Sequence, residues 1–430
     1  MGLGLHGGGA GTVRFLARHG AKITVTDLRS NRVLAPSLKA LADIKGILYV
    51  LGRHRTADFS RADIVIKNPG VRPDSPYLAA ARAHGAIITS DIGIFFRACP
   101  APIIGVTGTR GKSTTTYLIW KFLKEKYQRV HYGGNIRKSV LTILPRIKKT
   151  DIVVLELSSF QLTDLAREKK SPEIAVITNI QRDHLNWHTN MQDYIAAKSK
   201  IFTFQHPDDY MFINPDDPVL ARMAKKAGSR VVTPRLAAPL KKIVRENLGS
   251  HYESSVALAV AVAEQMRIPA LAIQKVLRSF QGLPERQEEI AIKRGVHFID
   301  DTTATTPDAA GAAIARFRKK AGKGRVILIG GGSDKKLDFR RMIRHIRASV
   351  DMLVLLPGSA TERIKKELRT INDESEIRDA KSMKDAVKIA YGLAAAGDYV
   401  LMSPGAASFG MFLNEFDRGK KFQDAVRMLK

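Results

Sequence analysis

Short runs of β-branched and apolar residues alternate with helical patterns along the whole chain. This alternation predicts parallel α/β layers, because a buried parallel strand is a continuous apolar run and a covering helix repeats its apolar residues every three to four positions. Helices are predicted at 76–84 and 252–265, among others. Strands are predicted at residues 23–26, 47–51, 64–66, 87–89, 103–106, 129–132, 152–157, 174–178, 211–213, 298–300, 326–329, 352–356 and 399–402.

Two interruptions divide this pattern into three predicted domains. Proline and glycine break it at Cys99-Pro-Ala-Pro102 and at Gly282-Leu-Pro284,. We therefore expect α/β domains at 1–98, 99–281 and 282–430. The first and third are expected to be Rossmann-like, and the central one to be a P-loop-type ATPase domain that carries the phosphate loop described below. A length of 430 residues suits several domains of ordinary size,.

Composition limits the class of protein. With 44% hydrophobic and 26% charged residues the chain is expected to be globular,. No apolar run approaches the roughly 20 residues of a membrane span, so no membrane insertion is expected. The single cysteine, Cys99, excludes a disulfide within the chain and fits a cytoplasmic location,.

The net charge of +29 indicates anionic partners,. It fits either a solvated basic surface on an enzyme whose ligands carry phosphates, or a nucleic-acid-binding surface. Lysine and arginine are spread along the chain without the interleaved aromatic residues of RNA-binding motifs,. The distribution favours the first interpretation, and a nucleic-acid partner is not expected.

The segment Gly105-Val-Thr-Gly108-Thr-Arg-Gly111-Lys112-Ser113-Thr114 has the composition of a phosphate-binding loop. It lies between an apolar run and a helical pattern, where backbone N–H groups and a helix N-terminus bind anions. Lys112 would reach a terminal phosphate and the Ser113 hydroxyl would bind Mg²⁺. Val106 occupies the first glycine position of the usual pattern, so an ordinary strand-to-helix turn is the alternative. The lysine and hydroxyl directly after Gly111 favour binding of a nucleoside triphosphate.

The first residues contain a second glycine motif. Gly2-Leu-Gly4-Leu-His-Gly7 matches G-x-G-x-x-G, and Asp27 follows 20 residues after Gly7. In dinucleotide-binding units such an acidic residue binds a ribose hydroxyl. The motif normally follows a strand, and here it follows Met1, so either that strand is absent or the true start lies upstream. The match indicates a nucleotide-diphosphate pocket more than an NAD site.

Three further polar residues follow predicted strands or lie in a nearby helix. Glu156 lies near the end of 152–157, and His184 follows 174–178. The carboxyl ends of parallel strands meet at one sheet edge, so both are expected near the phosphate loop. Glu156 suits a Mg²⁺ ligand, while His184 would bind metal or cap its loop. Lys198 lies within a helical pattern, where a surface lysine is the default. Together these groups fit phosphoryl transfer.

With these residues in view, the sequence resembles the Mur ligase family, the ATP-dependent amino-acid ligases of peptidoglycan synthesis, over essentially its whole length. Thr107–Ser113 is similar to the family's ATP loop. Further central-domain motifs are matched by Gly133-Gly-Asn135-Ile, Asn179…Asp183-His184 and Tyr194…Ala197-Lys198. Three segments resemble the member of the family that adds D-glutamate: 155–162 (LELSSFQL), 330–339 and 401–419.

The resemblance implies an activity. ATP would phosphorylate the carboxylate of UDP-N-acetylmuramoyl-L-alanine, and D-glutamate would attack the acyl phosphate. It also implies a cytoplasmic monomer with two Mg²⁺ ions and a carbamylated Lys198. A sister ligase, a folylpolyglutamate-type ligase and a non-catalytic nucleotide- or nucleic-acid-binding P-loop protein are the alternatives. The segment 155–162 argues against a sister ligase. Joint retention of Glu156, His184 and Lys198 argues against a binding module.

The resemblance also implies roles for individual residues. Lys112, His184 and Lys198 would be catalytic, and Ser113, Glu156, His184 and carbamylated Lys198 would bind metal. The ATP site would comprise Gly108, Thr109, Gly111, Lys112, Ser113, Thr114, Arg286 and Asp301. The two other substrates would contact Gly4, Leu5, His6, Asp27, Arg29 and Asn135 for the UDP-sugar and Thr305, Lys335, Ser408 and Phe409 for D-glutamate.

The chain departs from the family pattern at three places that concern ATP. Where many members have His-Asn-x-x-Asn, it has His251-Tyr-Glu-Ser-Ser255. Where they have Leu-x-His-Arg it has Leu283-Pro-Glu285-Arg286, and Asp301-Thr-Thr303-Ala-Thr305 lacks the usual lysine. The finer contacts to ATP are therefore expected to differ from those of other members.

Overall fold

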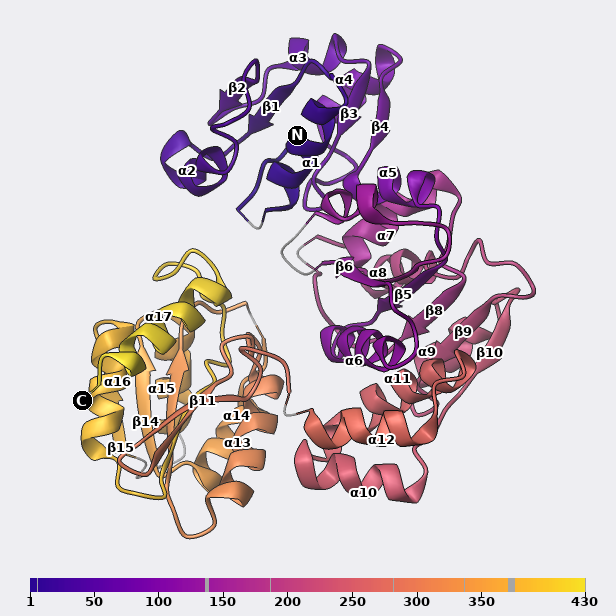
Figure 1. Ribbon diagram of the computed structural model, residues 1–430. Coiled ribbons are helices and arrows are strands. Elements are labelled where there is room, and N and C mark those ends of the chain that lie inside the picture. The colour runs from indigo at the N-terminus through magenta and orange to yellow at the C-terminus, as the bar shows by residue number, and fades with distance from the viewer. Residues whose placement is uncertain are drawn as a thin grey trace. The chain divides into compact units, whose positions relative to one another are not determined.

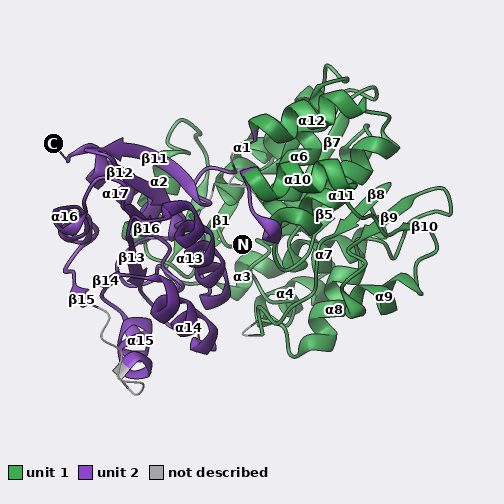
Figure 2. Cartoon of the chain, turned by 90° about the horizontal axis from the view of Figure 1, so that it is seen from below, with its two compact units in different colours: residues 1–246, 252–279 green, residues 247–251, 280–430 purple. Residues whose placement is uncertain are grey.

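Helices and mainly parallel strands alternate along the chain, which confirms the predicted α/β class (Figure 1). The structure is a computed structural model that describes residues 1–5, 7–135, 139–185, 187–280, 282–335, 337–369 and 376–429. The chain divides into two compact units, which are coloured separately in Figure 2. Unit 1 contains residues 1–246 and 252–279, and unit 2 contains residues 247–251 and 280–430.

The first part of unit 1 contains two pairs of parallel strands. Strand β1 (Thr24–Asp27) pairs with β2 (Leu48–Leu51), and β3 (Ile64–Ile66) pairs with β4 (Ile87–Thr89). Their helices are α1 (Gly8–Arg18), α2 (Asn31–Lys39), α3 (Thr56–Ser60), α4 (Pro76–Ala83) and α5 (Asp91–Ala98).

Residues 1–3 occupy the place of the strand that the glycine motif lacks. The N–H of Gly2 donates to the carbonyl of Thr26 at 2.7 Å, and the terminal amine of Met1 donates to the carbonyl of Ile66 at 2.9 Å. The N–H of Asn68 donates back to the carbonyl of Met1 at 2.9 Å. This short segment therefore bridges the two strand pairs and delivers the glycine motif to their edge.

The rest of unit 1 is built on a six-stranded parallel sheet with strand order β10-β9-β8-β5-β7-β6. The strands are β5 (Ile103–Thr107), β6 (Val130–Gly134), β7 (Ile152–Glu156), β8 (Ile174–Ile177), β9 (Tyr210–Ile213) and β10 (Arg230–Val232). The helices are α6 (Lys112–Lys124), α7 (Ser159–Leu165), α8 (Met191–Ser199), α9 (Pro218–Ala224), α10 (Ala238–Asn247), α11 (Glu253–Gln265) and α12 (Ala270–Ser279).

Unit 2 is built on a second six-stranded sheet with order β11-β12-β16-β13-β14-β15. Its strands are β11 (Glu288–Lys293), β12 (Val296–Asp300), β13 (Val326–Gly331), β14 (Met352–Leu356), β15 (Glu376–Asp379) and β16 (Tyr399–Met402). Its helices are α13 (Pro307–Ala321), α14 (Arg340–Ser349), α15 (Ser359–Arg369), α16 (Met383–Leu393) and α17 (Glu415–Arg427). Residues of α13, α14 and α15 pack in the core on one face, and those of α16 and α17 pack in the core on the other.

Three edge strands were not among the predicted ones. Strands β10, β11 and β15 each lie at the edge of a six-stranded sheet, and β11 runs antiparallel to β12. Their sequences mix charged and apolar residues, because an edge strand with one partner is only partly buried,. The continuous apolar pattern that marks the interior strands is therefore missing from them.

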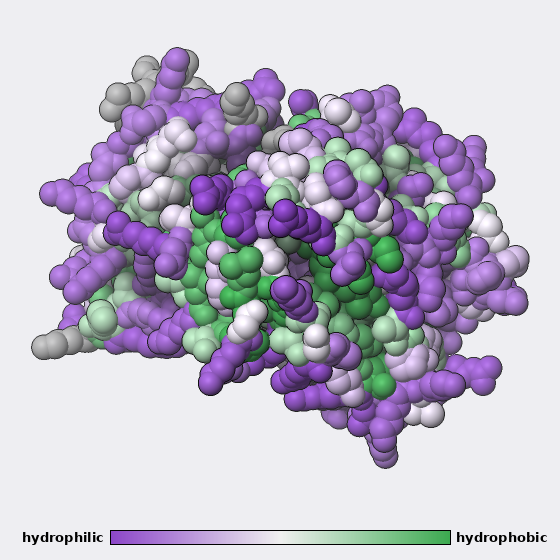
Figure 3. All heavy atoms as spheres, turned by 90° about the horizontal axis from the view of Figure 1, so that it is seen from above, coloured by the Kyte–Doolittle hydropathy of each residue, from purple (hydrophilic) through white to green (hydrophobic). Residues whose placement is uncertain are grey.

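Hydrophilic side chains cover much of the face drawn in Figure 3. Helix α14 illustrates how the positive charge is carried. Met342, Ile343 and Ile346 are buried, while Arg341, Arg344 and Arg347 are exposed. No helix within the described ranges combines the length and the apolar character needed to cross a membrane.

Candidate functional site

The predicted phosphate loop lies at the carboxyl edge of the sheet in unit 1. It follows β5, whose neighbours are β7 on one side and β8 on the other. The chain runs from β5 to β6 and β7 and then crosses to β8, so the strand order reverses beside β5. In open parallel sheets ligands bind at such a reversal point.

Two glycines give the loop its shape. Gly108 has φ +144° and Gly111 has φ +80°, values that L side chains rarely adopt,. A Cβ on Gly108 would lie 1.9 Å from Thr178 Oγ1, and one on Gly111 would lie 2.3 Å from Ser255 Oγ. Ser255 belongs to one of the segments that depart from the family pattern, so that change directly borders the loop.

Asn179 holds the loop in place from the end of β8. Its Oδ1 accepts a hydrogen bond from the N–H of Arg110 at 3.0 Å, and its Nδ2 donates to the Arg110 carbonyl at 3.0 Å. Its own carbonyl accepts from the N–H of Thr109 at 2.9 Å. The sequence placed Asn179 in a motif but assigned it no role; the structure shows that it braces the loop.

Replacement of Gly108 by alanine is expected to weaken binding of ADP by at least about a hundredfold. The new Cβ would meet a Thr178 hydroxyl that already donates to the Arg110 carbonyl at 2.5 Å, so the loop must move. Isothermal titration calorimetry measures the change. Gly228→Ala is the matched control, because a Cβ there meets nothing closer than 4.0 Å. Equal binding by both variants would contradict the role of this loop in binding the nucleotide.

Helix α6 begins directly after the loop, with Gly111 as its N-cap. Lys112 folds back, and its Nζ donates to the carbonyl of Thr109 at 3.0 Å. Thr114 is buried, while Ser113 is only partly buried. The positive end of the helix and the lysine therefore adjoin the same short loop, as binding of an anion requires.

Glu156 lies at the end of β7, in register with Val106 of β5 and Gly134 of β6. It is 3% exposed, and Asn135 Nδ2 donates to its Oε1 at 3.2 Å. Its other oxygen, Oε2, is buried without a hydrogen-bond partner. A buried carboxylate oxygen left unpaired is costly, and a hard cation would satisfy it.

Lys198 is buried in α8, contrary to the default of a surface lysine. Its Nζ donates to the carbonyl of Gly108 at 2.8 Å and to Thr107 Oγ1 at 3.3 Å. Burial lowers the pKa of Lys198 well below its usual range, and the nearby positive charge of Lys112 lowers it further. Asp183 and Glu156 act in the opposite direction. The amine therefore lies directly under the phosphate loop.

The side chain of His184, a predicted metal ligand, is partly exposed. Its side chain is 46% exposed, its φ is +53°, and its Nε2 lies 3.7 Å from Asp183 Oδ2. Its ring packs edge-on against Phe160 with the centroids 5.0 Å apart. The left-handed backbone at His184 turns the loop after β8. Asp183 and His184 therefore lie at the same edge of the sheet as Asn179.

His188 is a residue that the sequence reasoning missed. It is buried; its Nε2 lies 3.0 Å from Ser159 Oγ and its Nδ1 lies 3.3 Å from Asp193 Oδ2. Burial lowers the pKa of His188. These contacts join the first turn of α7, which follows Glu156, to α8, which carries Lys198. Only the H-x-x-x-H spacing from His184 could have drawn attention to it.

Among the described residues, no three His, Cys, Asp or Glu side chains come together in a way that could hold a metal ion. A cation at this edge would therefore need other oxygen ligands beside Glu156. Hydroxyl and phosphate oxygens are such ligands, and Mg²⁺ commonly combines one or two carboxylates with substrate phosphates.

Asp27 organises the predicted UDP site at the end of β1. Its carboxylate accepts from the N–H of Gly4 at 3.0 Å and from the N–H of Arg29 at 2.9 Å. Leu5 is partly buried next to Gly4, and His6 lies outside the described residues. Of the residues predicted for the UDP-sugar, Gly4, Asp27 and Arg29 thus lie together. Asn135, predicted for the same substrate, lies beside Glu156.

The residues predicted for D-glutamate follow three neighbouring strands of unit 2. Thr305 comes after β12, Lys335 after β13 and Ser408 after β16. Lys335 Nζ donates to Thr305 Oγ1 at 3.3 Å, and Ser333 pairs with Ala407 through two backbone hydrogen bonds of 2.9 and 3.0 Å. Their neighbour Phe409 is 65% exposed. The loops after β12, β13 and β16 therefore lie together at one edge of the sheet.

The two changed positions near the predicted ATP contacts touch each other in unit 2. Thr303 Oγ1 donates to the carbonyl of Glu285 at 3.1 Å, and Glu285 has a left-handed φ of +62°. Arg286 follows directly and lowers the pKa of Asp301 through its charge, against the larger effect of burial. Glu285 and Thr303, which both depart from the family pattern, are therefore in contact with each other. This contact lies next to Arg286 and Asp301, the two residues of unit 2 predicted to bind ATP.

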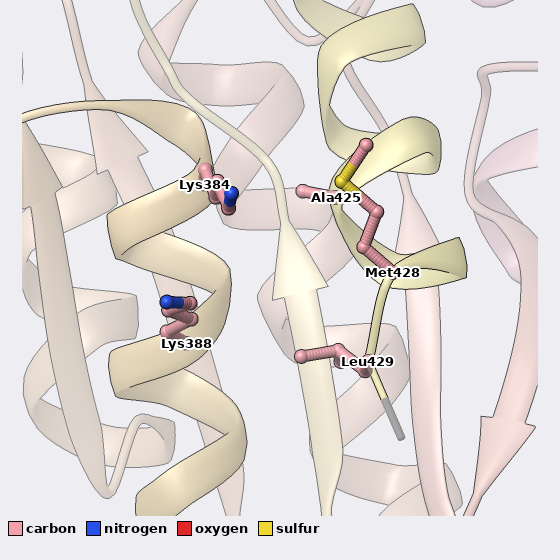
Figure 4. Close-up of a pocket in the computed structure, with 5 residues that line it drawn as sticks. All are labelled: Lys384, Lys388, Ala425, Met428 and Leu429. Carbon is pink, nitrogen blue, oxygen red and sulfur yellow. The ribbon is translucent and has the colours of Figure 1, made fainter.

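A separate pocket of about 230 Å³ lies between α16 and the end of α17 (Figure 4). Lys384, Lys388, Ala425, Met428 and Leu429 line it. None of the predicted site residues is among them. The predicted site is therefore defined by the loops at the sheet edges and not by this pocket.

Asp301→Asn is expected to change how the stability of the protein depends on pH. Burial raises the pKa of Asp301 to about 7, with Ser403 Oγ donating to its Oδ2 at 2.7 Å. The native pKa exceeds the unfolded one, so this carboxyl stabilises the fold below about pH 4, and that contribution is lost as the pH rises through about 7,. The wild type should therefore lose at least about 3 °C more than D301N between pH 5 and pH 8.

Circular dichroism melting curves at the two pH values measure this difference. Asp308→Asn, at an aspartate 54% exposed in α13, is the control and should follow the wild type. Parallel behaviour of D301N and the wild type would contradict the assignment of a buried carboxyl that resists ionisation.

The fold and this site define a class of protein. Three family models match the chain: the Mur ligase MurD-like N-terminal domain over residues 1–90, the Mur ligase middle domain over 106–274, and the Mur ligase glutamate ligase domain over 285–405. The chain belongs to the Mur ligase family, whose members are ATP-dependent ligases with an N-terminal, a middle and a C-terminal domain.

Individual relatives are similar over their full length. A UDP-N-acetylmuramoylalanine–D-glutamate ligase of Roseiflexus sp. (strain RS-1) is 40% identical, covering 99% of this chain and 97% of the relative. Its counterpart from Borreliella afzelii (strain PKo) is 38% identical, covering 100% and 97%. Among solved structures, the UDP-N-acetylmuramate-alanine ligase MurC of Thermotoga maritima has the same fold, with a TM-score of 0.65 at 17% identity over 100% of this chain and 98% of that one.

Proposed function

We propose that this protein joins D-glutamate to UDP-N-acetylmuramoyl-L-alanine and converts ATP to ADP and phosphate in the process. The observation that carries the chemistry is the convergence of the phosphate loop, Glu156 and Lys198 at one sheet edge. Relatives named for this reaction, at 38–40% identity over nearly the whole chain, support the choice of substrates.

The residues at this edge fit Mg²⁺. The unpaired Glu156 Oε2 offers a carboxylate oxygen, and Ser113 offers a hydroxyl at the start of α6. We assign Ser113, Glu156, His184 and a carbamylated Lys198 as the protein ligands, with two ions in all. When bound, Mg²⁺ would offset the negative charge of the transferring phosphoryl group.

Carbamylation of Lys198 fits its surroundings. The unprotonated amine would attack CO₂ and form an N-carboxylate with release of one proton. A cation is poorly placed at this buried position beside Lys112, whereas an anion there is attracted by the same Lys112 charge,. The modification thus turns a lysine that is costly to protonate into an oxygen ligand for metal.

The reaction follows from these positions in two steps. Lys112 and the N-terminus of α6 would hold the ATP phosphates while a carboxylate oxygen of the L-alanyl group attacks the γ-phosphorus and ADP leaves. The amine of D-glutamate then attacks the acyl carbon, loses a proton, and phosphate departs as the amide forms. Activation is necessary because a free carboxylate is a poor electrophile.

The remaining predicted residues hold the substrates. We assign the UDP group to Gly4, Leu5, His6, Asp27 and Arg29 and the muramoyl-alanine end to Asn135. ATP would also contact Gly108, Thr109, Gly111, Thr114, Arg286 and Asp301. D-Glutamate would contact Thr305, Lys335, Ser408 and Phe409.

We further propose that the three domains comprise residues 1–98, 99–281 and 282–430. The ranges matched by the three family models fall within these limits, which supports the division. The protein is further proposed to act in the cytoplasm as a monomer.

An isotope experiment tests this proposal. Purified protein is incubated with ATP, Mg²⁺, D-glutamate and UDP-N-acetylmuramoyl-L-alanine labelled with ¹⁸O in its carboxylate. We expect phosphate that carries one ¹⁸O atom, because the acyl oxygen leaves with the phosphate. Unlabelled phosphate would indicate simple ATP hydrolysis, and absence of phosphate would indicate a protein that only binds nucleotide.

A further inference from the structure

Arg418 is a buried arginine for which the proposed reaction has no use. It lies in the first turn of α17 and is 0% exposed. Its guanidinium donates three hydrogen bonds: Nε to Thr302 Oγ1 at 3.2 Å, Nη2 to the Thr302 carbonyl at 2.8 Å, and Nη1 to the Ala406 carbonyl at 3.0 Å. Burying an arginine costs free energy unless its donors are hydrogen-bonded. These three hydrogen bonds offset that cost, and breaking them would be unfavourable.

The two segments that Arg418 joins come from neighbouring strands. Thr302 follows β12 and Ala406 follows β16, and these strands pair in parallel. The first segment leads from Asp301 to Thr305, and the second leads to Ser408. The N–H of Gly405 also donates to the carbonyl of Ala304 at 2.9 Å, so the two loops lie side by side.

The start of α17 is closely fitted to the same place. Thr302 Oγ1 donates to the carbonyl of Glu415 at 2.6 Å, and Gln423 Nε2 donates to Asp300 Oδ2 at 2.9 Å. A Cβ on Gly419 would lie 2.7 Å from Thr302 Cγ2, so only glycine permits this approach. The helix therefore fixes the arginine with respect to the loops.

Nearby carboxyl groups favour the charged form of Arg418. Burial lowers the pKa of Arg418 to about 10, while Glu415, Asp300 and Asp301 raise it. Arginine suits this position better than lysine, because its planar guanidinium can donate hydrogen bonds to acceptors on two loops at once.

We infer that Arg418 is a positioning residue that clamps the loops after β12 and β16 together, so that Thr305 and Ser408 are held in place for the amino-acid substrate. The inference rests on the proposed function, in which those two residues contact D-glutamate. Arg418 itself touches no substrate and acts only through Thr302 and Ala406.

Arg418→Met tests the clamp, because methionine keeps much of the apolar volume and removes all three donors. We expect KM for D-glutamate to rise at least about tenfold, while KM for the UDP-sugar substrate changes less than about twofold. Arg418→Lys should restore part of the loss. Arg325→Met is the matched control: Arg325 pairs with Asp398 at the opposite end of the same sheet, and its loss should leave KM for D-glutamate unchanged.

Hydrogen–deuterium exchange provides a readout that does not depend on catalysis. Peptides covering 301–306 and 404–409 should exchange faster in R418M than in the wild type and in R325M. Unchanged exchange in these peptides would overturn the clamp, as would equal rises of KM for both substrates. If R418M does not fold, R418K must show the same two effects in smaller measure. A wild-type protein inactive with D-glutamate would instead refute the proposed function, and the exchange data would still decide on the clamp.

Discussion

Replacement of Lys198 by methionine is expected to reduce kcat by about a thousandfold. The variant keeps the apolar stem that packs in α8 and loses the amine that contacts the Gly108 carbonyl at 2.8 Å. Under our proposal it also loses the carbamate that binds metal. Steady-state release of ADP in the presence of both substrates measures the effect.

Two further measurements separate carbamylation from a purely structural role of Lys198. Lys200→Met, at the end of the same helix, is the control and should retain activity. The wild type supplied with ¹³C-bicarbonate should give a carbamate carbon resonance that K198M lacks. Full activity of K198M would contradict the assignment of Lys198 to the reaction, and absence of the resonance in the wild type would contradict its carbamylation.

Glu156→Gln is expected to lower kcat by about a hundredfold and to raise the Mg²⁺ concentration required for half-maximal activity. The amide keeps the shape of the side chain and can still accept from Asn135, but it removes the negative charge at Oε2. Titration of activity with Mg²⁺ at saturating ATP measures both effects.

Glu173→Gln is the matched control for Glu156→Gln. Glu173 lies before β8, at the amino end of the same sheet, and accepts from the N–H of Ile103 at 2.8 Å. An amide oxygen can replace that acceptor, so its Mg²⁺ dependence should equal that of the wild type. A parallel loss in both variants would mean that Glu156 supports only the fold.

Much of the fold could be predicted because the interior strands are buried on both faces. Strands β5 and β7 are buried at every position and mainly apolar, and their bounds agree with the predicted ranges to within a residue. Edge strand β11 could not be found in the same way, because the charged residues at both of its ends leave no long apolar run. An antiparallel partner at the edge of a parallel sheet leaves no local pattern in the sequence.

The candidate site was predictable where its residues adjoin strand ends. Glu156 ends strand β7 and the loop 108–111 follows strand β5, and these two strands are neighbours in the sheet. The burial of Lys198 was not predictable, since helix α8 has almost no apolar face of its own to indicate its orientation. Contacts such as Asp301 with Ser403 and Arg418 with Thr302 join residues about a hundred positions apart, and they depend on strand order.

Mass spectrometry of the nucleotide products tests the central claim most directly. The protein is incubated with ATP, Mg²⁺ and UDP-N-acetylmuramoyl-L-alanine, and D-glutamate, L-glutamate, L-lysine or L-alanine is supplied in turn. We predict a product with the mass of the substrate plus one glutamate minus water, formed with D-glutamate only, and one ADP for each product. Formation of a product with L-glutamate, L-lysine or L-alanine would contradict this prediction, as would the absence of a product with all four amino acids.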